Sequence, residues 1–167
     1  MPDQRPDIRI CDNYAIRIDR SGQWWHQGAP MTRHNLVVLF ARQLVRADDG
    51  AYWLQTPAEK GLITVEDLPF VVTASENRDG AVIFTTNCDD TVVLGRDHAL
   101  RMDAVDGEWR PAVHVRAGLW ARLSRAVYYD LAHHAVPSPD GTGMRGIVSD
   151  GIFFALEGPP LRAGEVA

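Results

Sequence analysis

Two stretches of this chain repeat the same order of features, and this repetition constrains the fold more than any other property of the sequence. Each copy begins with alternating apolar and arginine residues, then an Asp, a Gly turn and a Trp: "IRIDRSGQWW" at 16–25 and "LRMDAVDGEW" at 100–109. The copies are 85 positions apart, as the step from Gly22 to Gly107 shows. Recurrence of several features in the same order indicates an internal duplication.

Each copy continues with apolar residues at helical spacing and then with an Asp-Gly turn and an aromatic strand. The turn and strand are "DDGAYWLQTP" at 48–57 and "SDGIFFALEGP" at 149–159. In the second copy the spacing predicts a long helix from about Gly118 to His133. The predicted apolar stripes are Leu36, Leu39, Phe40 and Leu44 in the first copy and Leu119, Leu123, Val127 and Leu131 in the second.

The segment 61–97 between the copies has the composition of strands, rich in Val, Ile, Thr and Phe, with "NRDG" and "NCDD" as hairpin turns. The sequence therefore predicts an α+β protein of duplicated strand–turn–helix–strand units. We expect a small N-terminal unit at 1–59. A larger C-terminal unit at 60–167 would form a curled antiparallel sheet, or partial barrel, against which the long helix packs.

Bulk properties exclude several classes of function. A net charge of −5 and a pI near 5.6 provide no basic field for nucleic acid. No apolar run approaches the roughly 18 residues of a membrane span. Cys11 and Cys88 are far apart in sequence, which fits reduced thiols in a cytoplasmic protein better than a disulfide or zinc site. We expect a cytoplasmic protein without a membrane anchor and predict no cofactor.

Lys60, in "TPAEKGLITVEDLPF" at 56–70, is the only lysine of the chain, whereas every other basic residue is arginine. If the first unit ends near Pro57, Lys60 falls at the junction of the two units, where small-molecule sites tend to form. A lysine suits a phosphate or carboxylate in a narrow site. The alternative is a compositional accident, with Lys60 paired to Glu59 or Glu66 at the surface.

Two acidic residues follow Lys60 in the predicted strand. Alternation sends Val65 and Asp67 to one face and Glu66 to the other, so one carboxylate points away from the core. Glu66 or Asp67 could orient Lys60 or accept a hydrogen bond from a ribose or base. A solvated strand end before the Pro69 turn explains them equally well.

The segment "WWHQGAPMTR" at 24–33 supplies the remaining candidates. Thr32 is a candidate helix N-cap with Arg33 in the first turn, and a helix N-terminus is a natural anion site. Trp25 could stack on a planar ligand and His26 could hydrogen-bond to it. The alternatives are a simple capped helix and, for Trp24 and Trp25, one core indole, because adjacent strand residues face opposite sides.

Other motifs give little support for catalysis. Asp130 and His133 have a helical spacing that can ligate a metal, but no third ligand follows at a matching spacing, so we predict no metal site. No GxSxG nucleophile motif is present.

The run "WWHQGAPMTRHNLVVLFARQLVRADDGAYWLQTPAEKGLITVEDLPF", with "DHALRMD" and "GLWARLSRAVYYDL", resembles the bacterial domain of unknown function family 1285. The resemblance covers about Ile16 to Leu156. It implies a duplicated α+β fold whose second half is similar to a pleckstrin-homology-like barrel. It also implies a nucleotide-like ligand between the halves and a role in signalling.

We therefore expect a ligand-binding or sensing protein that takes a small anionic, nucleotide-like ligand at the interface of its units, with a possible protein partner in signalling. Lys60 and Arg33 would contact phosphate. The first alternative is an enzyme with Lys60 as base or electrostatic stabiliser and Glu59, Glu66 or His26 as proton-transfer partners. The second is a protein-interaction domain with an exposed apolar patch on the second unit.

Overall fold

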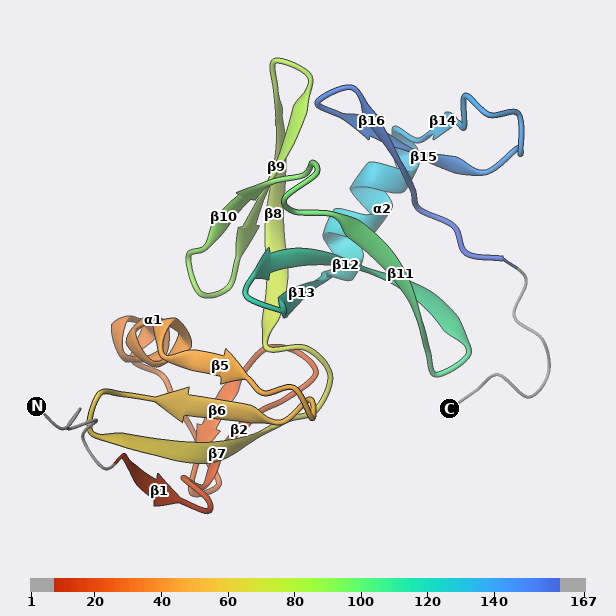
Figure 1. Cartoon of the computed structure of the whole chain (residues 1–167). Coiled ribbons are helices and arrows are strands. Elements are labelled where there is room, and N and C mark those ends of the chain that lie inside the picture. The colour runs from red at the N-terminus through yellow and green to blue at the C-terminus, as the bar shows by residue number, and fades with distance from the viewer. Residues whose placement is uncertain (1–7, 160–167) are drawn as a thin grey trace, which may run out of the picture. The chain divides into compact units, whose positions relative to one another are not determined.

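The computed structural model describes residues 8–159 and divides the chain into two compact units, Met1–Pro69 and Phe70–Ala167. The division lies after Pro69 rather than between residues 59 and 60, where the sequence placed it. The reason is that Lys60 belongs to a strand that hydrogen-bonds only within the first unit. Both units are mainly β-structure with one helix each, consistent with the α+β class (Figure 1).

A seven-stranded sheet forms the N-terminal unit around one long strand, β7 (Glu59–Val65). β6 pairs antiparallel along one edge of β7, while β1 and β2 pair parallel with successive segments of its other edge. The sheet order is β4-β3-β2-β7-β6-β5. The other strands are β1 (Arg9–Cys11), β2 (Ile16–Ile18), β3 (Trp24–His26), β4 (Ala29–Pro30), β5 (Leu44–Arg46) and β6 (Tyr52–Gln55).

The core of this unit follows the two-residue alternation of its strands. Ile16 and Ile18 of β2 are buried, and Trp24 of β3 is 1% exposed. The prediction that one of the adjacent tryptophans belongs to the core is confirmed for Trp24. Leu54 and Ile63 extend the same core across β6 and β7.

The helix α1 (His34–Arg42) differs from its predicted form in two respects. Its buried residues are Val37 and Ala41, whereas two members of the predicted stripe are open to solvent: Leu36 is 37% and Leu39 53% exposed. A third member, Leu44, is buried but lies in β5 and not in the helix. Helix periodicity identified the helix but not its buried face, because both sides of "NLVVLFA" are apolar. The N-cap is also Arg33 rather than Thr32, and no side chain caps the helix.

The C-terminal unit is built on a curled six-stranded sheet in the order β10-β9-β8-β13-β12-β11. Neighbouring strands are antiparallel except β8 and β13, which pair parallel over Phe70–Val72. The predicted "NRDG" and "NCDD" turns are confirmed, because they join β8 to β9 and β9 to β10. The strands are β8 (Phe70–Arg78), β9 (Ala81–Thr86), β10 (Thr91–Val93), β11 (Leu100–Val105), β12 (Glu108–Arg116) and β13 (Leu119–Leu123).

The helix α2 (Arg125–His133) begins seven residues later than the predicted start at Gly118. Leu119, Ala121 and Leu123 are nearly fully buried in β13, so the apolar residues that fit a helical stripe also fit the two-residue period of a strand. Ser124 separates the two elements, because its hydroxyl accepts a hydrogen bond from Val127 N and caps the helix.

A three-stranded sheet, β14-β15-β16, completes the C-terminal unit. The fully buried Ser149 attaches it to the larger sheet: its Oγ accepts from Val82 N at 2.9 Å and donates to Leu94 O at 2.7 Å. The strands are β14 (Val136–Pro137), β15 (Arg145–Ser149) and β16 (Ile152–Ala155). Within residues 8–159, neither helix has the length and apolar character required to cross a bilayer.

Candidate functional site

The two faces of the N-terminal sheet separate residues that are neighbours in the sequence. Ile16 pairs with His26, and Arg17 pairs with Trp25. Since directly paired residues lie on the same face, His26 lies on the face of the buried Ile16, and Trp25 lies with Arg17 on the opposite face. The predicted candidates Trp25 and His26 therefore do not belong to the same site.

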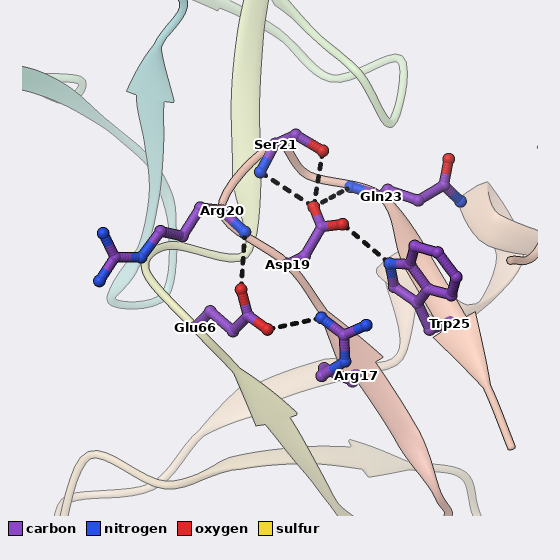
Figure 2. A network of polar contacts seen from close by, with 7 residues as sticks. All are labelled: Arg17, Asp19, Arg20, Ser21, Gln23, Trp25 and Glu66. Carbon is purple, nitrogen blue, oxygen red and sulfur yellow. Dashed lines mark hydrogen bonds and ion pairs between the residues drawn. The ribbon is translucent and has the colours of Figure 1, made fainter. Parts of the chain in front are cut away.

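A polar network centred on Asp19 occupies the Arg17 face (Figure 2). The Asp19 carboxylate accepts hydrogen bonds from Ser21 N at 2.9 Å, Ser21 Oγ at 2.6 Å, Gln23 N at 3.0 Å and Trp25 Nε1 at 2.8 Å. Burial alone would raise the pKa of Asp19. The hydrogen bonds from Ser21, Trp25 and Gln23 outweigh burial and hold the pKa below its ordinary value.

Glu66 extends this network from the end of β7. Its carboxylate accepts from Arg17 Nη1 at 2.5 Å and from the Arg20 backbone N–H at 3.3 Å (Figure 2). The Arg17 guanidinium also lies 5.0 Å from the centre of the Trp25 ring. Glu66 lies on the Arg17 face of the sheet, not on the face of the buried Ile16. Asp67 lies in the bend that follows β7.

The lone lysine lies in β7, opposite Gln55 of β6. Its Nζ is 4.6 Å from the centre of the Trp53 ring, two residues from Gln55 on the same face of β6. Among the described residues, no carboxylate forms an ion pair with Lys60. Glu59 precedes Lys60 in the strand and so points to the opposite face, where it approaches Tyr14.

Tyr14 covers the other face of β7 at Gly61. A Cβ atom at Gly61 would lie 2.0 Å from the Tyr14 ring, so only glycine leaves room for this packing. Burial raises the pKa of the Tyr14 phenol, and the Glu59 carboxylate raises it further. Glu59 and Tyr14 thus form a separate cluster from Lys60 and Trp53.

A groove of about 410 Å³ lies on the His26 face and brings three of the predicted residues together. Its apolar lining comes from β2, from the segment before α1 and from the first two turns of the helix. His26, Thr32 and Arg33 form its polar part. We call this space the N-terminal groove; it is lined by Ile16, His26, Met31, Thr32, Arg33, Leu36 and Phe40.

Local backbone geometry brings these residues together. The hairpin between β3 and β4 turns at Gln27 and Gly28, both with positive φ, and this tight turn places His26 at the end of β3 opposite Ala29. The chain then returns towards α1, with Met31 N bonded to Trp24 O at 2.8 Å. Thr32 and Arg33 consequently lie beside the groove where the helix begins.

The polar end of the N-terminal groove carries positive charge. Arg33 is the extended N-cap of α1, and its carbonyl accepts from the N–H groups of Leu36 and Val37. The first turn of the helix contains no acidic residue. The Arg33 guanidinium and the positive end of the helix dipole therefore favour an anionic group at this end.

The predicted site residues thus do not form one site. His26, Thr32 and Arg33 line the N-terminal groove; Trp25 and Glu66 belong to the Asp19 network; and Lys60 contacts Trp53. Sequence reasoning did not identify the apolar part of the groove. Two apolar residues of the groove, Leu36 and Phe40, stand out in the sequence, but the helix pattern assigned them to the core.

Within residues 8–159, no group of three or more His, Cys, Asp or Glu side chains is arranged to hold a metal ion. Asp130 and His133, whose spacing in the sequence could ligate a metal, both lie in α2. The His134 ring contacts the backbone carbonyl of Asp130.

Comparison with known protein families shows that two family models match consecutive parts of the chain. Residues 4–68 match a model described as "Domain of unknown function (DUF1285), N-terminal domain". Residues 69–156 match "Protein of unknown function (DUF1285), C-terminal domain". The chain belongs to the DUF1285 family. The division between the two family models falls within one residue of the division between the compact units.

Two solved structures of DUF1285 proteins are similar to this chain. A DUF1285 family protein from Silicibacter pomeroyi DSS-3 is 35% identical, with 93% of this chain and 86% of the other aligned at a TM-score of 0.80. A DUF1285 family protein from Shewanella baltica OS155 is 27% identical, with 71% of this chain and 91% of the other aligned at a TM-score of 0.58. No curated protein matches the chain in sequence.

Proposed function

We propose that this DUF1285 protein binds a small anionic ligand with a planar or apolar body, such as a nucleotide, in the N-terminal groove. The observation that carries the proposal is the combination of apolar walls from Ile16, Met31 and Phe40 with Arg33 and an uncapped helix start at one end. The volume of about 410 Å³ is within the usual range of small-molecule sites. The anionic group would contact Arg33, and His26 and Thr32 would supply directional hydrogen bonds.

The positions of the acidic candidates favour binding over catalysis. An enzyme would require proton-transfer groups beside one another, but Glu66 faces Arg17 on the opposite side of the sheet from His26. Glu59 approaches Tyr14, and Lys60 contacts Trp53. The groove therefore has one ionisable acid–base candidate, His26, which supports recognition of a ligand rather than its conversion.

A signalling role is a second part of the proposal. In that account, ligand in the N-terminal unit would bias the arrangement of the two units, and a protein partner would detect the change. The pleckstrin-homology-like character of the C-terminal unit likewise remains a proposal, supported by its curled sheet with a helix.

We further propose that the duplication predicted from the sequence is real. In support, the motif glycines Gly22 and Gly107 both have positive φ in turns between antiparallel strands. The paired "DG" motifs likewise lie in antiparallel hairpins, at Gly50 and Gly151. A nine-residue helix lies between the two motifs in each copy.

Thermal unfolding tests the binding proposal. The protein would be screened against nucleoside monophosphates, cyclic nucleotides and dinucleotides, and then the screen repeated with Arg33→Gln. A ligand at a hundredfold excess over its dissociation constant stabilises the folded protein by about 2.7 kcal/mol. We expect this stabilisation for wild type and for Arg42→Gln, a matched loss of charge at the far end of the same helix, and its loss in Arg33→Gln.

Absence of stabilisation across the panel would contradict the proposal. Equal stabilisation of Arg33→Gln and wild type would place the ligand elsewhere. Recovery of the compound unchanged after incubation separates binding from turnover, since an enzyme would release a product.

A further inference from the structure

One edge of β8 in the C-terminal unit has an incomplete set of strand partners. β8 runs from Phe70 to Arg78 and pairs with β9 over most of that length, but β13 covers its other edge only at Phe70–Val72. Beyond Val72, none of the described strands pairs with this edge. An unpaired strand edge presents N–H and C=O groups that another chain can bind.

The phase of the β8–β9 ladder identifies which groups point outwards. The hairpin turns through Asp79 and Gly80, both with positive φ, so Arg78 and Ala81 form the closing hydrogen-bonded pair. Hydrogen-bonded and non-bonded pairs alternate in an antiparallel ladder, and Asn77 and Val82 therefore form a non-bonded pair.

The contacts of Val82 confirm this phase. Its N–H donates to Ser149 Oγ at 2.9 Å and its carbonyl accepts from Leu94 N at 2.9 Å, both directed away from β8. The N–H and C=O of Asn77 must then point away from β9 as well, and so must those of Ser75, two residues earlier. Within residues 8–159, no backbone hydrogen bond uses these four groups.

A groove of about 400 Å³ lies along this edge, which we call the β8 groove. The helix α2 runs beside β8, and the sheet of β14 and β15 lies near the end of the helix (Figure 1). Three buried residues, Val82, Leu131 and Ile147, form its floor, while Val136 and Val148 on its walls are 43% and 47% exposed. An aliphatic side chain would remove both valines from water.

The rim of the β8 groove is predominantly acidic. Glu76 and Asp130 line it, together with the C-terminal end of α2, which carries the negative end of the helix dipole. One basic group reduces this charge, because Arg78 pairs with Glu76 at 2.6 Å. The His134 ring contacts the backbone carbonyl of Asp130 at 2.9 Å and not its carboxylate. The Asp130 carboxylate has no ion pair among the described residues.

We propose that the β8 groove binds an extended peptide segment of a partner protein, which adds a strand to the edge at Ser75 and Asn77. The peptide would carry a basic side chain opposite Asp130 and aliphatic side chains against Val136 and Val148. Backbone hydrogen bonds would supply affinity, and alternate side chains would supply specificity, as in other cases of strand addition. This site is independent of the proposed N-terminal groove.

Hydrogen exchange in the free protein is the first test. The amides of Ser75 and Asn77 should exchange rapidly, whereas those of Glu76 and Arg78, which bond β9, should be protected. Protection of all four amides in the free monomer would overturn the proposal. Protection that rises with protein concentration, together with dimer formation in sedimentation, would also overturn it, because a second copy of the chain would then occupy the edge.

Selection from a displayed library of random short peptides is the second test. We expect the selected peptides to share a basic residue with aliphatic residues two positions away on either side. Synthetic peptides with the selected sequences should, when bound, protect the amides of Ser75 and Asn77 from hydrogen exchange. Selection of no peptide, or of peptides that bind without protecting these amides, would overturn the proposal.

Charge reversal tests the recognition of the basic side chain. Asp130→Lys should weaken the selected peptide about tenfold, equivalent to about 1.4 kcal/mol. Glu108→Lys, which reverses a charge in β12 outside the groove, should leave affinity unchanged. Equal affinity of both variants would overturn the assigned role of Asp130. Both residues are exposed, so neither change is expected to disturb folding.

Discussion

The Lys60 ammonium nitrogen lies 4.6 Å from the centre of the Trp53 ring, so the only lysine of the chain is partnered by an aromatic face rather than by a carboxylate. Register explains the contact: Lys60 lies opposite Gln55, and Trp53 is the next residue on that face of β6. An arginine can also stack on an indole, so this contact alone does not require lysine.

Substitution of Lys60 separates a structural from a ligand-binding role. Lys60→Met should lower the free energy of unfolding by about 0.5–1 kcal/mol because the cation–π contact is lost, and Lys60→Arg should retain most of it. Chemical denaturation measures both effects. Because Lys60 does not line the N-terminal groove, neither variant should change affinity for a ligand bound there. A large loss of affinity in Lys60→Arg would instead support the original prediction of a lysine-specific site.

Asp19 should make stability depend on pH in the acidic range. Its pKa is lowered in the folded protein, so its stabilisation is present above the unfolded value of about 3.9 and is lost as pH falls through the lower folded value. Asp19→Asn should cost about 1–2 kcal/mol at pH 7, because the amide cannot accept all four hydrogen bonds. Chemical denaturation of the wild type and of Asp19→Asn at pH 7 and pH 3 measures the difference in their free energies of unfolding. This difference should shrink at the lower pH.

The indole N–H of Trp25 offers a local check on the same group. It donates to Asp19 Oδ2 at 2.8 Å, so its NMR signal should shift as Asp19 titrates. A signal that titrates at the ordinary aspartate value, or a stability difference that is constant with pH, would contradict the assigned hydrogen bonds.

Gly61→Ala should destabilise the N-terminal unit by about 2–3 kcal/mol, because the new methyl group would overlap the Tyr14 ring. Gly95→Ala is the matched control, since the nearest atom to its Cβ would be Val93 O at 3.8 Å. Thermal and chemical denaturation compare the two. In a Tyr14→Ala background the cost of Gly61→Ala should largely disappear, and an unchanged cost would show that another contact is responsible.

Ser149→Ala should destabilise the C-terminal unit by about 2–3 kcal/mol, because it leaves the buried Val82 N–H and Leu94 C=O without their hydroxyl partner. Ser75→Ala, which removes a hydroxyl from the wall of the β8 groove, should cost much less. Denaturant unfolding of the two variants measures the contrast. Equal effects would mean that Ser149 does not join the two sheets.

Local patterns predicted those parts of the fold that depend on neighbouring residues. Alternation assigned one of two adjacent tryptophans to the core, and turn residues placed the hairpin at Asp79. The predicted start of α2 was wrong, because Leu119 and Leu123 fit both the helical period and the two-residue period of a strand. Pairing decides between them: β13 pairs with β12, its neighbour in the chain, and with β8, which is distant in sequence.

The candidate site was less predictable than the fold. His26, Thr32 and Arg33 are close in sequence, and the structure places them in one groove. Lys60 and Trp25 were joined to them through an expected junction near residue 59, but the register of β7 places Lys60 beside Trp53. The prediction ended the first unit near Pro57, whereas Pro57 lies in the turn of the β6–β7 hairpin, whose register depends on that turn and on the apolar pattern of its strands.

The most direct test of the account is a heteronuclear NMR titration of the labelled protein with AMP, GMP, CMP and UMP. We expect saturable shifts at the backbone amides of Arg33 and Asn35 and at the His26 ring for at least one of them. Arg33→Gln should abolish these shifts and Arg42→Gln should preserve them. No saturable shift with any of the four, or shifts that survive in Arg33→Gln, would contradict a nucleotide-like ligand in the N-terminal groove.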